Sequence, residues 1–136
     1  MKLDSNNHSV FALHYHLVMC IKYRKKVLDD KISTRLQEIF EDICPKYGVE
    51  LLEWNHDKDH VHLLFKSKPN TELSTLLNAY KSASSRRIKN EFPQIKKYLW
   101  KEYFWSKSYC LVATGRASLE VVKQYMENQG KESEVR

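Results

Sequence analysis

The chain has 136 residues, of which 42% are hydrophobic and 29% are charged, and its formal net charge is +6. This length suits one domain with a single core and is too short for two, and the composition excludes a disordered chain. No apolar run reaches the length of a membrane span and the first residues lack a secretory signal, so we expect a cytoplasmic protein. The prediction is one domain over 1–136, with flexible ends at 1–8 and 130–136.

The first half of the chain predicts a strand, a helix and a hairpin. Phe11–Ile21 is rich in strand formers, and its odd positions form one apolar face. Apolar residues recur at helical spacing over Asp30–Tyr47. Val49–Asn55 and His60–Phe65 are typical strands, and the short polar turn between them predicts that they pair as a hairpin.

The second half predicts a helix, a strand and a final helix. Pro69–Glu72 begins the first of these helices, and Phe92-Pro93 ends it. Tyr109–Thr114 is the predicted strand, which Gly115 ends, and a helix follows from Ser118 to about Gln129. The order predicts an α+β fold of ferredoxin-like or RRM-like type, with an antiparallel sheet, helices on one face and one additional C-terminal helix.

The cysteines do not predict a disulfide framework or a zinc site. Cys20, Cys44 and Cys110 are odd in number, widely spaced and without C-x-x-C pairing. We expect them to be reduced and mostly buried.

Positive charge is concentrated in two segments. Lys81–Lys107 contains eight lysines and arginines against two glutamates, and Lys22–Lys26 adds a second basic cluster. Such clustering favours a polyanionic partner such as DNA, and a solvated basic helix face is the alternative interpretation. The candidate DNA-contacting residues are Lys22, Arg24, Lys25, Lys81, Arg86, Arg87 and Lys89.

Two histidines are candidates for a metal site. His60 and His62 lie two apart on a predicted strand, so both side chains project from one face while Val61 points to the other. Two imidazoles need at least one further ligand to hold a catalytic cation. The motif alone is weak, because His14 and His16 have the same spacing. The alternative is a pair of hydrogen-bonded, half-buried histidines.

The final predicted helix offers a nucleophile and a third ligand. Tyr125 and Gln129 lie one turn apart on one helix face. A phenol needs a cation or a base to attack at neutral pH, and it can form a covalent phosphotyrosine with DNA. A divalent cation, Mg²⁺ or Mn²⁺, held by His60, His62 and Gln129 would orient the scissile phosphate. The alternative for Tyr125 is an ordinary amphipathic core position.

Four segments together resemble a known family. They are His14–Val18 (HYHLV), Lys22–Lys25 (KYRK), Asp57–Leu64 (DKDHVHLL) and Val121–Gln129 (VVKQYMENQ). They are similar to the single-tyrosine HUH transposases (TnpA type) of bacterial and archaeal insertion sequences. The similarity extends from about Phe11 to Gln129, and the combination of the DHVH and VVKQY motifs is highly specific.

The resemblance implies a function and an assembly. It implies that Tyr125 is the nucleophile and that His60, His62 and Gln129 are the metal ligands. Such enzymes cut single-stranded DNA at element ends, form a 5′-phosphotyrosine, release a 3′ hydroxyl and rejoin strands. They act as homodimers on DNA hairpins, and the tyrosine helix of one subunit can complete the site of the other.

Two other functions remain open from the sequence. One is a domesticated HUH nuclease that processes chromosomal palindromes, which would share the same site. The other is a non-catalytic ferredoxin-like module that binds nucleic acid through aromatic residues on its sheet. The aromatic signature of such RNA-binding modules is absent, since His62 and its neighbours occupy the strand where stacking rings would be needed.

Overall fold

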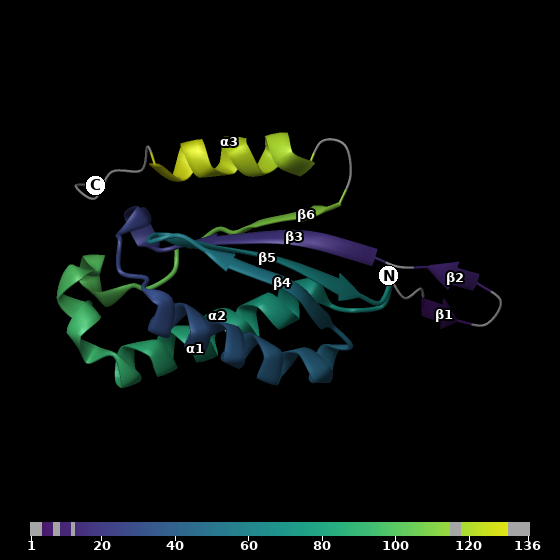
Figure 1. Ribbon diagram of the computed structural model, residues 1–136, viewed down its shortest axis with the longest axis horizontal. Helices are drawn as coiled ribbons and strands as arrows, with labels where there is room; N and C mark the ends of the chain where they lie inside the picture. The colour runs from purple at the N-terminus through teal and green to yellow at the C-terminus, as the bar shows by residue number, and fades with distance from the viewer. Residues whose placement is uncertain (1–3, 7–8, 12, 115–117, 131–136) are drawn as a thin grey trace.

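The fold is a four-stranded antiparallel sheet between two helical layers (Figure 1). The computed structural model describes residues 4–6, 9–11, 13–114 and 118–130. The strand order is β4-β5-β3-β6, so the first and third strands of the predicted series occupy the centre of the sheet. The strands are β3 (Leu13–Cys20), β4 (Glu50–His56), β5 (His60–Ser67) and β6 (Cys110–Ala113).

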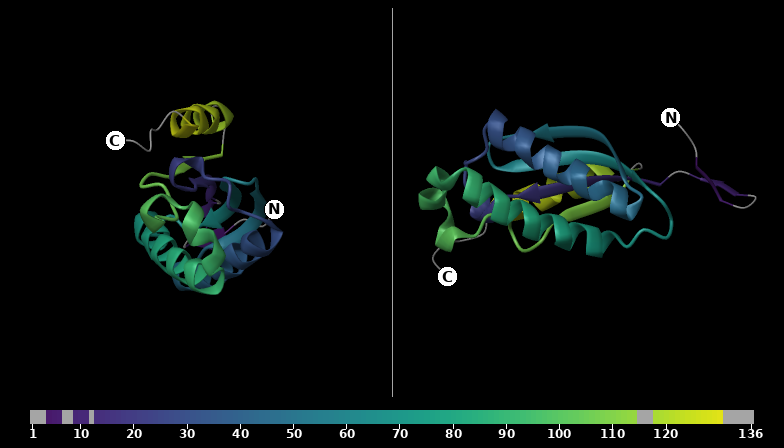
Figure 2. Two further views of the ribbon diagram at one scale, coloured as in Figure 1. Left: turned by 90° about the vertical axis from the view of Figure 1, so that its left-hand side faces the viewer. Right: turned by 90° about the horizontal axis from the view of Figure 1, so that it is seen from below.

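Two long helices cover one face of this sheet. They are α1 (Asp30–Ile43) and α2 (Leu73–Glu91), and they lie side by side beneath the strands (Figure 2). Helix α1 begins at Asp30 because the Asp29 carboxylate accepts a hydrogen bond from the Ile32 amide at 2.8 Å. It is shorter than the predicted helix, since Pro45 turns the last four residues, Cys44–Tyr47, into a 3₁₀ turn that left-handed Gly48 closes.

The central strands β3 and β5 have one face in the main hydrophobic core and another face that carries the histidines. Met19 pairs with Val61 and Leu17 with Leu63, and all four side chains are buried against α1 and α2. The intervening residues face the other way, so the predicted alternation of β5 is confirmed. Cys20 pairs with His60, and Val18 pairs with His62. Strand pairing therefore places both histidines on the face opposite the main core.

The second face of the sheet is covered by the C-terminal helix α3 (Ser118–Gly130), seen above the strands in Figure 1. Val122, Tyr125 and Met126 pack there against a small cluster formed by Val18, Cys20 and Cys110. All three cysteines are buried, as predicted. The α+β, ferredoxin-like architecture with a separate tyrosine-bearing helix is thus confirmed.

The structure also contains elements that the sequence analysis does not predict. A two-stranded hairpin, β1 (Asp4–Asn6) and β2 (Ser9–Phe11), projects away from the sheet (Figure 1). Three short 3₁₀ turns lie at the opposite end of the molecule: η1 (Lys22–Arg24), η3 (Pro93–Tyr98) and η4 (Trp100–Glu102). Gly115 and most of the predicted flexible ends lie outside the described chain, which omits residues 1–3, 7–8, 12, 115–117 and 131–136. Within the described part, no helix is both long and apolar enough to cross a membrane.

Candidate active site

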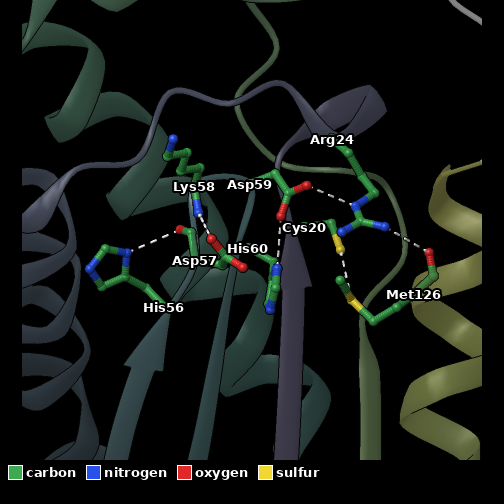
Figure 3. Close-up of polar contacts among 8 residues, drawn as sticks. All are labelled: Cys20, Arg24, His56, Asp57, Lys58, Asp59, His60 and Met126. Carbon is green, nitrogen blue, oxygen red and sulfur yellow. Dashed lines mark hydrogen bonds and ion pairs between the residues drawn. The ribbon is translucent and has the colours of Figure 1, made fainter.

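His60 begins strand β5 and is held by the residue before it. Its Nδ1 lies 2.8 Å from Oδ1 of Asp59 (Figure 3). An ionised carboxylate only accepts hydrogen bonds, so Nδ1 carries a proton and Nε2 is the ring nitrogen that remains for a ligand. This is the arrangement by which a carboxylate commonly orients a metal-binding histidine. His60 therefore has a free nitrogen suited to a cation.

Asp59 is in turn held by Arg24. The Nε of Arg24 lies 3.0 Å from Oδ2 of Asp59, so the two carboxylate oxygens serve different partners. Burial by itself would raise the pKa of Asp59, but the hydrogen bonds from His60 and Arg24, together with the positive charge of Arg24, hold that pKa below its ordinary value. The carboxylate is thus ionised at neutral pH and can accept the hydrogen bond from His60.

His62 lies one step further along the same face and contacts a third histidine. Its Nε2 is 3.3 Å from Nδ1 of His16 on β3, and the ring centroids are 5.3 Å apart. Burial lowers the pKa of His62, and the neighbouring His16 and His60 lower it further. His62 is therefore neutral at physiological pH, which is the form of imidazole that binds metals.

Tyr125 and Gln129 both project from α3 onto the segment that precedes β6. The Tyr125 hydroxyl donates to the backbone carbonyl of Ser108 at 3.0 Å. Gln129 is 6% exposed; its Oε1 accepts from the Ser106 hydroxyl at 2.7 Å, and its Nε2 donates to Ser108 Oγ at 3.2 Å. Burial raises the pKa of the Tyr125 phenol well above its ordinary value. In this position Tyr125 is a neutral phenol.

The structure brings the candidate residues together as two pairs on one face of the sheet. His60 and His62 lie on β5, whereas Tyr125 packs over β3 and β6 and Gln129 contacts Ser106 and Ser108, just before β6. The side-chain oxygen of Gln129 is engaged by Ser106 and does not complete a three-ligand set with the histidines. Among residues 4–6, 9–11, 13–114 and 118–130, no group of three or more His, Cys, Asp or Glu side chains is arranged to hold a metal ion.

Arg24 has a role that the sequence analysis does not assign. The sequence suggests only a DNA contact, but the guanidinium bridges two elements of the site (Figure 3). Besides Asp59, it contacts the backbone carbonyl of Met126 on α3, with Nη1 at 3.3 Å. The Cys20 thiol also donates to the Met126 sulfur at 3.6 Å. No local pattern predicts these contacts, because the partners are 35 and 102 residues from Arg24.

Some of the other basic candidates line a separate groove of about 690 Å³ beside α2. Lys81, Arg86 and Lys89 contribute to it, and two of them already have partners. Lys81 Nζ donates to the carbonyl of Lys107 at 2.8 Å, and Lys89 Nζ donates to that of Glu102 at 3.1 Å. These lysines hold the loop after α2 in place. The described residues that line this groove include no histidine.

The structure thus combines an antiparallel sheet that carries paired histidines on one face with a tyrosine-bearing helix over that face. Residues 9–129 match the family model of IS200-like transposases. The chain therefore belongs to the IS200-like transposase family, as the sequence resemblance predicts.

Individual relatives agree with this assignment. The ISDra2 transposase TnpA of Deinococcus radiodurans is 35% identical over 120 residues, which cover 88% of this chain and 86% of the relative. The transposase for insertion sequence element IS200 of Salmonella typhimurium is 26% identical over 129 residues, covering 94% and 84%.

Two solved structures are similar. A crystal structure of a candidate transposase from Deinococcus radiodurans R1 has a TM-score of 0.82 and 34% identity, and the match covers 93% of this chain and 97% of that one. The REP-associated tyrosine transposase bound to a REP hairpin has a TM-score of 0.58 and 11% identity, with coverage of 92% and 67%. At that identity the second similarity concerns the fold alone.

Proposed function

We propose that this chain cleaves and rejoins single-stranded DNA at insertion-sequence ends through a 5′-phosphotyrosine on Tyr125. The observation that carries the proposal is that His60 and His62 share one face of the sheet with the helix that bears Tyr125. The other face is closed by α1 and α2. A single surface thus presents two imidazoles and a phenol, the groups that a metal-assisted tyrosine transesterification requires.

The reaction balances without an external energy source. The Tyr125 oxygen attacks the scissile phosphorus and loses its proton, and the 3′ oxygen leaves and is protonated to a 3′ hydroxyl. Rejoining is the reverse reaction with a different 3′ hydroxyl. Because burial raises the pKa of Tyr125, the phenol must leave its hydrogen bond to Ser108 and lose its proton to a base as it attacks.

The donor chemistry of the site fits a divalent cation, Mg²⁺ or Mn²⁺. Asp59 fixes the His60 proton on Nδ1, which leaves Nε2 for a ligand, and His62 is neutral. Gln129 would supply an amide oxygen once it releases the Ser106 hydroxyl. When bound, such a cation supplies Lewis-acid stabilisation of the phosphate. The chain itself orients His60 through Asp59, and burial favours the uncharged form of His62.

A homodimer accounts for the separation of the two pairs. In the single chain, Tyr125 and Gln129 are both bound to the segment Ser106–Ser108 and not to the histidines. We propose that α3 moves on assembly, so that the tyrosine helix completes the site beside His60 and His62, its own or those of a partner. The proposed substrate is single-stranded DNA that folds into hairpins at the element ends.

The test is covalent trapping. The single-stranded DNA that flanks the gene, labelled at its 3′ end, is incubated with the protein and Mg²⁺ or Mn²⁺, and the products are separated on a denaturing gel. The wild type should carry the label as a protein adduct, and Tyr125→Phe should form none while still binding the DNA. Tyr98→Phe, which changes an exposed tyrosine of η3, is the control and should retain the adduct. An adduct in Tyr125→Phe would refute the proposal, and a shift without any adduct in the wild type would favour a binding module.

A further inference from the structure

A second, smaller cavity lies beside η1 and has a distinctive lining. Its volume is about 290 Å³. Four aromatic rings, those of Tyr23, Trp100, Tyr103 and Trp105, form its walls. The other lining side chains are lysines: Lys22, Lys101 and Lys107. Among the described residues no acidic side chain lines the cavity, which therefore combines flat apolar surfaces with positive charge.

The aromatic rings of the cavity contact one another, and two lysine ammonium groups lie over ring faces. Trp100 meets Tyr23 edge to face at 5.3 Å between ring centroids and lies nearly parallel to Tyr103 at 6.0 Å. Lys22 Nζ is 4.9 Å from the Tyr23 centroid, and Lys101 Nζ is 4.6 Å from that of Trp100. Tyr103 is 57% exposed, so its ring offers a free face to a ligand.

The backbone on both sides of the cavity is strained. Among the described residues, four other than glycine have a positive φ: Tyr23 at 56°, Arg24 at 53°, Lys101 at 50° and Glu102 at 61°. They form two pairs, one in η1 and one in η4, whose aromatic residues meet in this cavity. Left-handed backbone is unfavourable for residues with a side chain, and such residues cluster at functional sites.

The cavity adjoins the candidate active site. The Lys22 amide donates to the Phe104 carbonyl at 2.9 Å, and the Ser106 amide donates to the Cys20 carbonyl at 2.9 Å, which ties the two walls to β3. Arg24, next to Tyr23, holds Asp59 and so reaches His60. In the other direction, Tyr103 and Trp105 also line the larger basic groove on α2. The cavity thus shares two aromatic residues with that groove, and the residue next to Tyr23 is linked through Asp59 to His60.

We propose that this cavity binds one unpaired nucleotide of the DNA strand, next to the phosphate that is cleaved. The base stacks on the exposed ring of Tyr103, and the lysines face the adjoining phosphates. A base within a duplex has both faces covered by its neighbours and cannot enter, so the cavity selects a single strand. This inference rests on the proposed function only for the position of the cleaved phosphate.

The test is DNA binding without cleavage, measured by fluorescence anisotropy in the absence of divalent metal. The probe is a fluorescein-labelled oligothymidylate of about ten nucleotides, within the usual span of a single-strand site. Tyr103→Ala should weaken binding about ten-fold, the loss expected for one stacked base. Tyr98→Ala is the matched control, because Tyr98 is 58% exposed and lines neither cavity. Both residues are exposed, so both variants should fold.

A second pair of variants tests the charge. Lys101→Gln should reduce the slope of log affinity against log salt by about 0.7, the value for one phosphate contact on a single strand. Lys97→Gln, whose ammonium contacts Tyr98 outside the cavity, should leave the slope unchanged. Equal affinities for Tyr103→Ala and Tyr98→Ala would overturn the inference. It would also be overturned if the wild type bound a DNA duplex, or the RNA strand oligouridylate, more tightly than oligothymidylate. Since no adduct is measured, failure here is distinct from failure of the tyrosine chemistry.

Discussion

Arg24 and Asp59 form an ion pair, with Nε of the guanidinium 3.0 Å from Oδ2 of the carboxylate. The pair joins two parts of the candidate site, because Asp59 also holds His60 and Arg24 also contacts the Met126 carbonyl on α3. The orientation of a candidate metal ligand is therefore linked to the position of the helix that carries the candidate nucleophile. A displacement of α3 would remove one of the partners of Arg24.

We predict that Arg24→Gln weakens Mn²⁺ binding by about 10- to 100-fold, the usual cost of losing an outer partner of a ligating histidine. Isothermal titration with Mn²⁺ measures the effect. Arg35→Gln is the matched control: its side chain is 30% exposed, as is that of Arg24, but it pairs with Glu91 and Glu38 on the surface. Equal affinities in the two variants would show that the ion pair does not support a metal site.

We predict that His60→Ala reduces metal-dependent adduct formation by more than about 100-fold, because a lost ligand should cost more than a lost outer partner. The measurement is the initial rate of adduct formation with Mg²⁺ or Mn²⁺. His56→Ala is the control, since its side chain is 23% exposed against 20% for His60 and bonds to Asp30 on α1. Full activity in His60→Ala would remove the histidine pair from the mechanism.

We predict that Ser84→Ala lowers the free energy of unfolding by about 1–3 kcal/mol, because it leaves a buried donor unsatisfied. The Trp105 indole N–H donates to Ser84 Oγ at 2.9 Å, and both residues are buried. Urea unfolding measures the change. Ser82→Ala lies on the exposed side of the same helix and should stay within about 0.5 kcal/mol of the wild type. If Ser84→Ala left the free energy of unfolding unchanged, the hydrogen bond from Trp105 would not anchor the loop to α2.

We predict that the buried Cys44 thiol makes the folded protein less stable at alkaline pH. Burial, with a contribution from the charge of Glu41, raises its pKa to about 12. The unfolded thiol ionises near pH 8.5, so the folded state loses stability as the pH rises above that value. Between about pH 8 and pH 10, the wild type should lose about 2 kcal/mol more than Cys44→Ala. Urea unfolding under reducing conditions at both pH values is the measurement, and equal losses would contradict the prediction.

Local periodicity was enough to predict most of the fold. The alternation in His60–Phe65 separates Val61 and Leu63 from the two histidines, and that separation depends only on the two-residue repeat of a strand. The helical spacing of α1, α2 and α3 likewise follows from the apolar residues of each segment. The β1–β2 hairpin was missed because neither strand is longer than three residues, too short for a repeat to be visible.

The sequence by itself determined the order of the elements, the shared face of His60 and His62, and the family, because each depends on residues close together in the chain. Only the tertiary structure decided that Arg24 serves Asp59 and α3, that Gln129 rests on Ser106, and that η1 and η4 enclose an aromatic cavity. Those contacts join residues that are 23 to 102 positions apart. Packing sets such distances, and no repeat within a segment encodes them.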